Sequence, residues 1–178
     1  MSRKSVFHTS LATALLLISA TVFAASAPAN IAVSANVSTT CTITATPLAF
    51  GDYDPIGVNA TADKTGAGSV SVACAKGAAT LTIGMNYGTH VSGTTQRQMV
   101  GPTATDLLSY NLFQPSSTAA GAACPGTIAW TTATPGLLVL TTSPSKAART
   151  YNVCGTIPMG QDTSAGAYTD TVIATLNF

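Results

Sequence analysis

The sequence predicts an all-β protein built as a sandwich of short strands. Three observations carry this prediction. After Ala24 the chain favours Thr, Val, Ile, Tyr and Ser, and strong helix formers do not follow one another. Apolar and polar residues alternate along several stretches of strand length, and no helical stretch of useful length follows Ala24. Gly and Pro separate these stretches, as turns between strands require.

The first 24 residues have the three parts of a secretory signal peptide: a positively charged start, an apolar run over Leu11–Phe23 and small residues at the exit. The apolar run is too short for the roughly 30 Å hydrocarbon core of a bilayer, so a signal peptide is favoured over a retained membrane helix. Small residues at the −3 and −1 positions place the cleavage between Ala24 and Ala25. The mature chain is therefore expected to leave the cytoplasm.

The composition argues against several classes of function. Charged residues make up only 7% of the chain and hydrophobic residues 46%, which excludes a disordered protein. Without the signal peptide, five Lys and Arg stand against six Asp, so no basic surplus exists for binding nucleic acid. His90 is then the single histidine, and such a lack of titratable groups predicts neither an enzyme nor a site for a metal or cofactor.

Four cysteines, an even number in an exported chain, favour disulfide bonds. No two of them have the short spacing of a zinc-binding pair, so a zinc site is disfavoured. We predict the pairs Cys41–Cys74 and Cys124–Cys154, because each then joins neighbouring strand-like segments. Four cysteines allow three connectivities, and the sequence alone leaves the other two open.

The first predicted strand covers Ile31–Thr46 and is ended by Pro47. Its first half alternates, with one face formed by Ile31, Val33, Ala35 and Val37. The next two strands are predicted at Ser69–Cys74 and Thr80–Met85, with a turn at Lys76–Ala78 between them.

The second half of the chain holds the remaining strands. Those in its interior are predicted at Leu107–Gln114, Thr127–Thr132, Leu137–Thr142 and Arg149–Ile157. The last one, Tyr168–Phe178, alternates so that Val172 and Leu176 face one way and Ile173 the other. Seven to nine such strands with turns between them indicate one β-sandwich domain.

The stretch Gly51–Gly68 is predicted to be a long loop. It contains Asp52, Asp54 and Asp63, whose carboxylates are of the type that binds calcium. Pro55 and its neighbours interrupt the alternate spacing that calcium ligands need. A solvated loop is therefore favoured over a calcium site.

Several motifs resemble the spore coat protein U domain family and the related subunits of archaic chaperone–usher pili. They are the run FGDYDP at Phe50–Pro55, LSYNLF at Leu108–Phe113, GTIP at Gly155–Pro158 and GAYTDTV at Gly166–Val172. In order, these motifs span nearly the whole mature chain. Such subunits also carry a cystine at the position of Cys41 and Cys74, whereas many lack counterparts of the other two cysteines.

The resemblance implies an incomplete immunoglobulin-like, pilin-type β-sandwich in which one strand is missing. The resulting groove is filled first by a strand of a periplasmic chaperone and then by the N-terminal extension of the next subunit. On this basis the chain divides into a signal peptide (1–24), an extension (25–37) and a sandwich (38–178). The donor residues are expected to be Ile31, Val33, Ala35 and Val37, although an ordinary internal first strand is the alternative.

The function that the resemblance implies is an exported structural subunit of a surface pilus or fibre, acting in adhesion or biofilm formation. Its implied partners are the periplasmic chaperone, an outer-membrane usher and neighbouring subunits in a homo- or hetero-polymer. The alternative is a secreted monomeric module that binds carbohydrate or surfaces through Trp130, Tyr53 and Tyr87, or a spore-coat-like protein. A hydrolase using His90 is disfavoured, since the sequence has no Gly-x-Ser-x-Gly motif and His90 is expected to be a solvated loop residue.

Overall fold

The computed structural model describes residues 24–178, and the chain divides into two units at Asn36 and Val37. Apart from Ala24, the predicted signal peptide lies outside the described residues. The described strands are β1 (Cys41–Ala49), β2 (Lys64–Cys74), β3 (Thr82–Met85), β4 (Val91–Ser92), β5 (Gln96–Val100), β6 (Leu107–Phe113), β7 (Leu138–Val139), β8 (Arg149–Ile157) and β9 (Ala174–Asn177). A single 3₁₀ turn, η1 (Val58–Ala60), precedes β2. None of the described helical segments is long and apolar enough to cross a bilayer.

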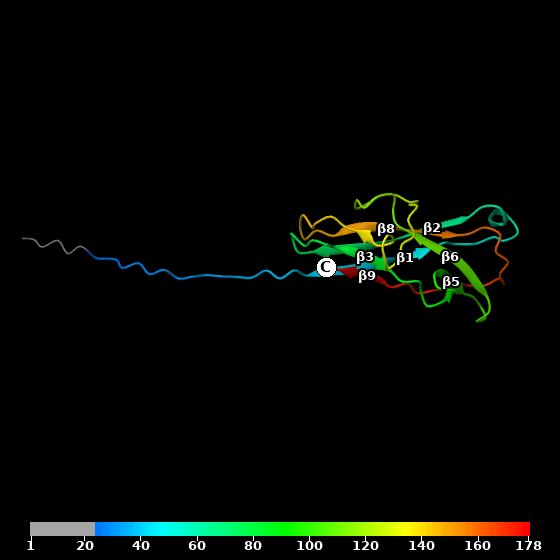
Figure 1. Ribbon diagram of the computed structural model, residues 1–178, viewed down its shortest axis with the longest axis horizontal. Coiled ribbons are helices and arrows are strands. Elements are labelled where there is room, and N and C mark those ends of the chain that lie inside the picture. The colour runs from blue at the N-terminus through cyan, green and yellow to red at the C-terminus, as the bar shows by residue number, and fades with distance from the viewer. Residues whose placement is uncertain (1–23) are drawn as a thin grey trace, which may run out of the picture. The chain divides into compact units, whose positions relative to one another are not determined.

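Alternation of apolar and polar residues builds the larger sheet of residues 37–178, in which six strands pair in the order β1-β2-β8-β6-β5-β4 (Figure 1). Every pairing in it is antiparallel. The inward positions of β2 and β6 alternate along each strand, so Val70 and Val72 are buried from one and Leu108 and Leu112 from the other.

The smaller sheet has three antiparallel strands in the order β7-β3-β9. Its buried residues Ile83 and Leu138 belong to the same hydrophobic cluster as the inward residues of the larger sheet. Trp130 lies in that cluster with no exposed surface. Two sheets sharing one core confirm the predicted all-β sandwich.

The predicted turn at Lys76–Ala78 is present, but it does not make a hairpin. Gly77 adopts φ +86°, and the amide of Ala78 donates to the carbonyl oxygen of Ala75 at 3.1 Å. Because β2 and β3 belong to different sheets, this turn carries the chain from one layer of the sandwich to the other.

Three predicted boundaries are wrong at the start of the sandwich. The predicted strand over Ile31–Thr46 begins only at Cys41, where pairing with β2 starts, and residues 24–40 are exposed and outside any strand. Pro47 does not end it, because β1 is an edge strand whose register shifts between Thr46 and Ala49. The predicted loop Gly51–Gly68 is shorter, because β2 already begins at Lys64.

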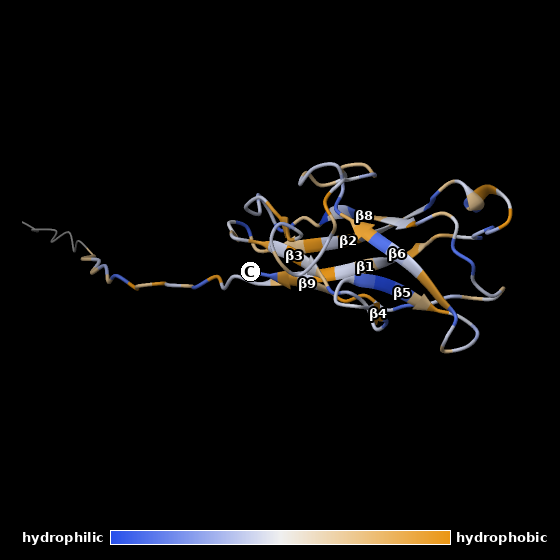
Figure 2. Ribbon diagram, turned by 45° about the vertical axis from the view of Figure 1, so that its right-hand side comes forward, coloured by the Kyte–Doolittle hydropathy of each residue, from blue (hydrophilic) through white to orange (hydrophobic). Residues whose placement is uncertain are grey.

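Other corrections concern the second half of the chain. The predicted strand Thr127–Thr132 is a loop with a single β-bridge between Phe113 and Ala129. The strands at Leu137–Thr142 and Tyr168–Phe178 are reduced to β7 and β9. Strands β4 and β5 were not predicted. The first part of β5 is drawn as hydrophilic in Figure 2, and the one buried side chain of this strand is that of Arg97.

Candidate functional site

Two edge strands define the candidate site. Strand β1 ends the larger sheet and pairs only with β2, while β9 ends the smaller sheet and pairs only with β3. Among residues 37–178, each of these strands therefore has one side without a neighbouring strand. Backbone N–H and C=O groups along such a side are ready to pair with an added strand.

A cavity of about 470 Å³ lies between β1 and the segment that leads into β9. Its lining combines Leu48 at the β1 side, Val172 and Ala174 at the β9 side, and the core residues Val70 and Leu112 of the larger sheet. The first three are only partly buried although they pack against the core. Apolar side chains that pack against the core are thus partly accessible where a further strand is absent.

A second cavity of about 910 Å³ adjoins the first and shares with it Leu48, Phe50, Met99 and Tyr168. It extends between the loops at residues 51–56 and 160–168. We call the two adjoining cavities the inter-sheet groove.

Glycines of the larger sheet allow Leu48 and Phe50 to line this groove. A Cβ placed on Gly155 would lie 2.7 Å from Cζ of Phe50 and 2.8 Å from Cδ1 of Leu48. A Cβ on Gly66 would lie 2.8 Å from Cδ1 of Phe50. The glycines therefore let both apolar side chains lie directly on the sheet at the mouth of the groove.

A buried carboxylate holds the other wall of the groove. The Asp170 side chain is 2% exposed and accepts hydrogen bonds from the hydroxyl of Tyr110 at 2.6 Å and from the amide of Thr89 at 2.8 Å. The Thr89 hydroxyl donates to the same carboxylate at 2.6 Å. Burial alone would raise the pKa of Asp170, but the hydrogen bonds from Thr89 and Tyr110 outweigh it and lower that pKa.

Arg97 connects the two sheets behind this wall. Its guanidinium is buried and donates to the carbonyl oxygens of Asn86 at 2.7 Å and Trp130 at 2.7 Å, and it lies 5.1 Å from the centre of the Tyr87 ring. Burial lowers the pKa of Arg97, which still remains a cation at neutral pH. The side chain of Asn86 in turn accepts from the amide of Ile173 at 2.8 Å, which fixes the segment before β9.

Comparison with known proteins identifies the family of this chain. The sequence model of the Spore Coat Protein U domain matches residues 27–175. The chain belongs to this family. Family membership confirms the resemblance read from the sequence motifs.

One curated protein and one solved structure are similar to this chain. Protein U of Myxococcus xanthus is 35% identical over 166 residues, which cover 87% of each chain. A solved structure with TM-score 0.43 and 21% identity is the CsuC–CsuE chaperone–tip adhesion subunit pre-assembly complex from archaic chaperone-usher Csu pili of Acinetobacter baumannii. That match covers 80% of this chain and 40% of the solved chain, so this chain spans less than half of that chain's length.

The predicted donor residues of the SCPU domain are exposed. Ile31, Val33 and Val37 are 86%, 91% and 85% exposed, and Ala35 is exposed as well. Because they belong to no strand of the described residues, their predicted role as a donor strand stays a prediction. The cleavage between Ala24 and Ala25 likewise stays a prediction.

Both disulfides have the predicted connectivity. Cys41 is joined to Cys74, which is its direct partner in the β1–β2 register. Cys124, in a loop, is joined to Cys154 of β8. These bonds attach the edge strand β1 to β2 and the loop before β7 to β8, two interior strands of the larger sheet.

The aromatic residues considered for carbohydrate binding have structural partners. Trp130 lies in the core and donates its Nε1 hydrogen to the carbonyl oxygen of Ile83 at 2.9 Å. The Tyr53 hydroxyl joins the loops of the groove through Pro158 and Gln161. His90 is not simply solvated, since its Nδ1 lies 3.7 Å from the carboxylate of Asp170.

Two of the three aspartates considered for calcium accept hydrogen bonds from backbone amides. Asp54 accepts from the amide of Gly57 at 2.8 Å, and Asp63 accepts from the amide of Met159 at 2.9 Å. Within residues 24–178, no three His, Cys, Asp or Glu side chains are grouped so that they could hold a metal ion.

Sequence reasoning missed the residues that fix the wall of the groove. Arg97 was overlooked because a buried cation disrupts the apolar alternation by which strands are recognised. A usable signal was its position in a strand-length stretch between Gly93 and Gly101. Asp170 was noticed only as part of a family motif, and its partner Tyr110 is 60 residues away in sequence.

Proposed function

We propose that this protein is an exported structural subunit of a surface fibre, in which the extension of one copy fills the inter-sheet groove of the next. The single observation that supports this most is an apolar groove flanked by two edge strands, each of which has a neighbour on one side only. Such a groove accepts a strand rather than a small molecule, because backbone pairing is available along both walls.

The extension has the properties of a suitable donor. Asn30–Val37 spans about 26 Å when extended at roughly 3.3 Å per residue, and it has no proline. Ile31, Val33 and Val37 are almost fully exposed, so each gains about 1.5–3 kcal/mol on complete burial. New backbone hydrogen bonds to β1 and β9 add to this gain.

An unfilled groove exposes apolar surface and strand edges, so the subunit needs protection before assembly. A periplasmic chaperone that lends a strand, and an outer-membrane usher that replaces it with the next subunit, meet this need. Export by the predicted signal peptide and display on the cell surface, with a role in adhesion or biofilm formation, complete the proposed function.

A pair of neighbouring substitutions tests strand exchange. Val33→Asp places a charge on the face that enters the groove, whereas Ser34→Asp places the same charge on the opposite face. We expect Val33→Asp to abolish polymers that resist denaturant without boiling, while Ser34→Asp assembles normally and both variants still bind the chaperone. Equal assembly of the two variants, seen as the same ladder on gels and the same fibres by electron microscopy, would contradict the proposal.

A second candidate is a coat-like protein that covers a cell or spore without forming pili. It is favoured by the match of the Spore Coat Protein U domain to residues 27–175. Electron microscopy of surface material distinguishes the two, because a pilus subunit gives thin fibres and a coat protein gives a continuous layer.

A further inference from the structure

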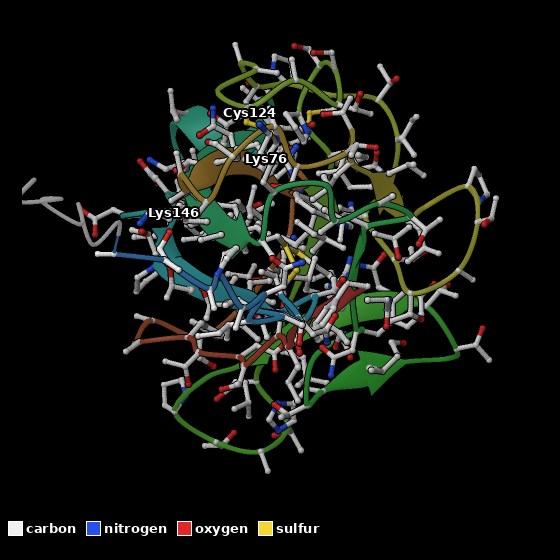
Figure 3. The ribbon with its side chains drawn as sticks, turned by 90° about the vertical axis from the view of Figure 1, so that its left-hand side faces the viewer. Lys76, Cys124 and Lys146 are labelled. Atoms are coloured by element: carbon white, nitrogen blue, oxygen red, sulfur yellow. A yellow bond between two sulfur atoms is a disulfide. The ribbon has the colours of Figure 1, made fainter. Side chains whose placement is uncertain are left out.

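The sandwich of residues 37–178 has two ends of opposite charge. One end carries the start of β1, the end of β2 and the start of β8, because Cys41 pairs with Cys74 and Arg149 with Val72. Figure 3 looks onto this end, with the exposed Lys76 and Lys146 labelled on it. We call it the basic end, and its cations are Lys76, Lys146 and Arg149.

The opposite end carries the loops after β1 and after β8. The amide of Met159 donates to Asp63 at 2.9 Å and that of Gly160 to the carbonyl oxygen of Asn59 at 2.8 Å, so these two loops lie together. We call this the acidic end, and its exposed carboxylates are Asp52, Asp54, Asp63 and Asp162. Among residues 37–178, Lys64 is the one cation at this end, where its backbone pairs with Ile157 in the β2–β8 register.

The acidic end is continuous with the inter-sheet groove and also exposes apolar side chains. Asp52, Ile56 and Asp162 line the larger cavity of the groove. Ile56 is 93% exposed and Val58 70%, which leaves apolar surface beside the carboxylates.

The link between extension and sandwich brings the basic end close to any groove that the extension enters. Only Ser38, Thr39 and Thr40 separate Val37 from Cys41, a reach of about 10 Å when extended. The carbonyl oxygen of Thr40 accepts from the amide of Ala75 at 2.9 Å, so the link starts beside Lys76.

We propose that, in the fibre, the basic end of one copy docks on the acidic end of the next, at the mouth of the groove that the extension fills. This interface rests on the strand exchange proposed above and takes a second copy of this chain as its partner. If the donor copy instead docked at the basic end of the acceptor, two basic ends would lie together and repel each other. A head-to-tail contact of two different surfaces also leaves both ends of a growing fibre open for further copies.

Charge reversal at each end tests this interface. The basic-end variant carries Lys76→Glu and Lys146→Glu, and the acidic-end variant carries Asp52→Lys and Asp162→Lys. Within residues 24–178, the side chains of these four residues form no hydrogen bond. Lys64→Glu is the matched control, since it removes a cation from the acidic end. Assembly of the purified full chain is followed by light scattering at about 20 mM and about 500 mM NaCl, with circular dichroism to verify folding.

We expect salt to slow assembly of the wild-type chain roughly tenfold, because about 500 mM salt screens charges beyond a few Å. Each reversal should slow assembly to a similar extent at low salt, whereas the control assembles at least as fast as the wild type. A chain carrying all four reversals restores complementary ends and should regain the wild-type rate. The proposed interface would be overturned if the basic-end and acidic-end variants both assembled at the wild-type rate. It would also be overturned if the variant with all four substitutions did not recover that rate.

The outcome separates this interface from strand exchange. If the charge reversals have no effect but gels still show a ladder of polymers that disappears on boiling, strand exchange stands and end-to-end docking is wrong. If the wild-type chain forms no ladder at all, docking is measured directly as salt-sensitive self-association by sedimentation velocity. Absence of such self-association, or its persistence in the single-end variants, then refutes the docking.

Discussion

Removal of the Asp170 carboxylate should destabilise the sandwich at the wall of its groove. The side chain is 2% exposed and accepts hydrogen bonds from Tyr110 and Thr89. A hydrogen bond to a charged group contributes about 1.5–3 kcal/mol, and Asp170→Ala also leaves the hydroxyl of the 4% exposed Tyr110 without its acceptor. We expect the free energy of unfolding to fall by about 3–5 kcal/mol, less than the sum of the separate bonds because they share one acceptor.

A double-mutant cycle with Tyr110→Phe isolates one of these bonds. Tyr110→Phe alone should cost about 1.5–3 kcal/mol, and combined with Asp170→Ala it should cost little more than Asp170→Ala alone. Urea unfolding of the isolated subunit, extrapolated to water, measures each value. Asp162→Ala is the control, since this exposed carboxylate has no hydrogen bond to any residue of 24–178. Its removal should change stability by less than about 0.5 kcal/mol.

Two results would refute this reasoning. One is an Asp170→Ala variant as stable as the Asp162→Ala control. The other is additivity of Asp170→Ala and Tyr110→Phe, which would mean that the two side chains do not share a bond in solution.

Three further predictions concern stability. The pKa of Asp170 lies below its ordinary value of 3.8, so the contribution of this carboxylate to folding stability is complete at neutral pH and is lost as the pH falls through and below about 4. Urea unfolding at a series of pH values should show this loss of stability. In Asp170→Asn the loss should be smaller. Replacing Cys41 by Ala opens a cross-link to Cys74 across 33 residues and should cost up to about 4 kcal/mol, and an unchanged melting temperature would contradict this. Trp130→Phe removes the hydrogen bond to the carbonyl oxygen of Ile83 at 2.9 Å and some buried volume. It should lower the free energy of unfolding, measured in urea, by about 1–3 kcal/mol. A smaller decrease would mean that the indole N–H is not bonded there.

Local alternation predicted some strands well and failed at others for identifiable reasons. Strand β8 has the predicted bounds, and β6 differs by one residue at its end, because buried residues recur at every second position along most of each strand. Strand β5 escaped notice because Arg97 occupies its buried position, where backbone oxygens from other segments bind its guanidinium. The alternation before Cys41 does not form a strand among the described residues, since a strand also needs a neighbour to pair with.

The sequence by itself determined the all-β class and the family to which the chain belongs, because composition, period-two alternation and ordered motifs are local properties of the chain. It favoured the disulfide pairs that the structure contains but left the other two connectivities open. Only the tertiary structure decided where the groove lies. Its walls are β1 and the segment before β9, which are far apart in sequence, and their lack of outer neighbours follows from the strand order of both sheets. The wall depends equally on contacts such as that of Asp170 with Tyr110, which no local pattern encodes because folding alone brings the two side chains together.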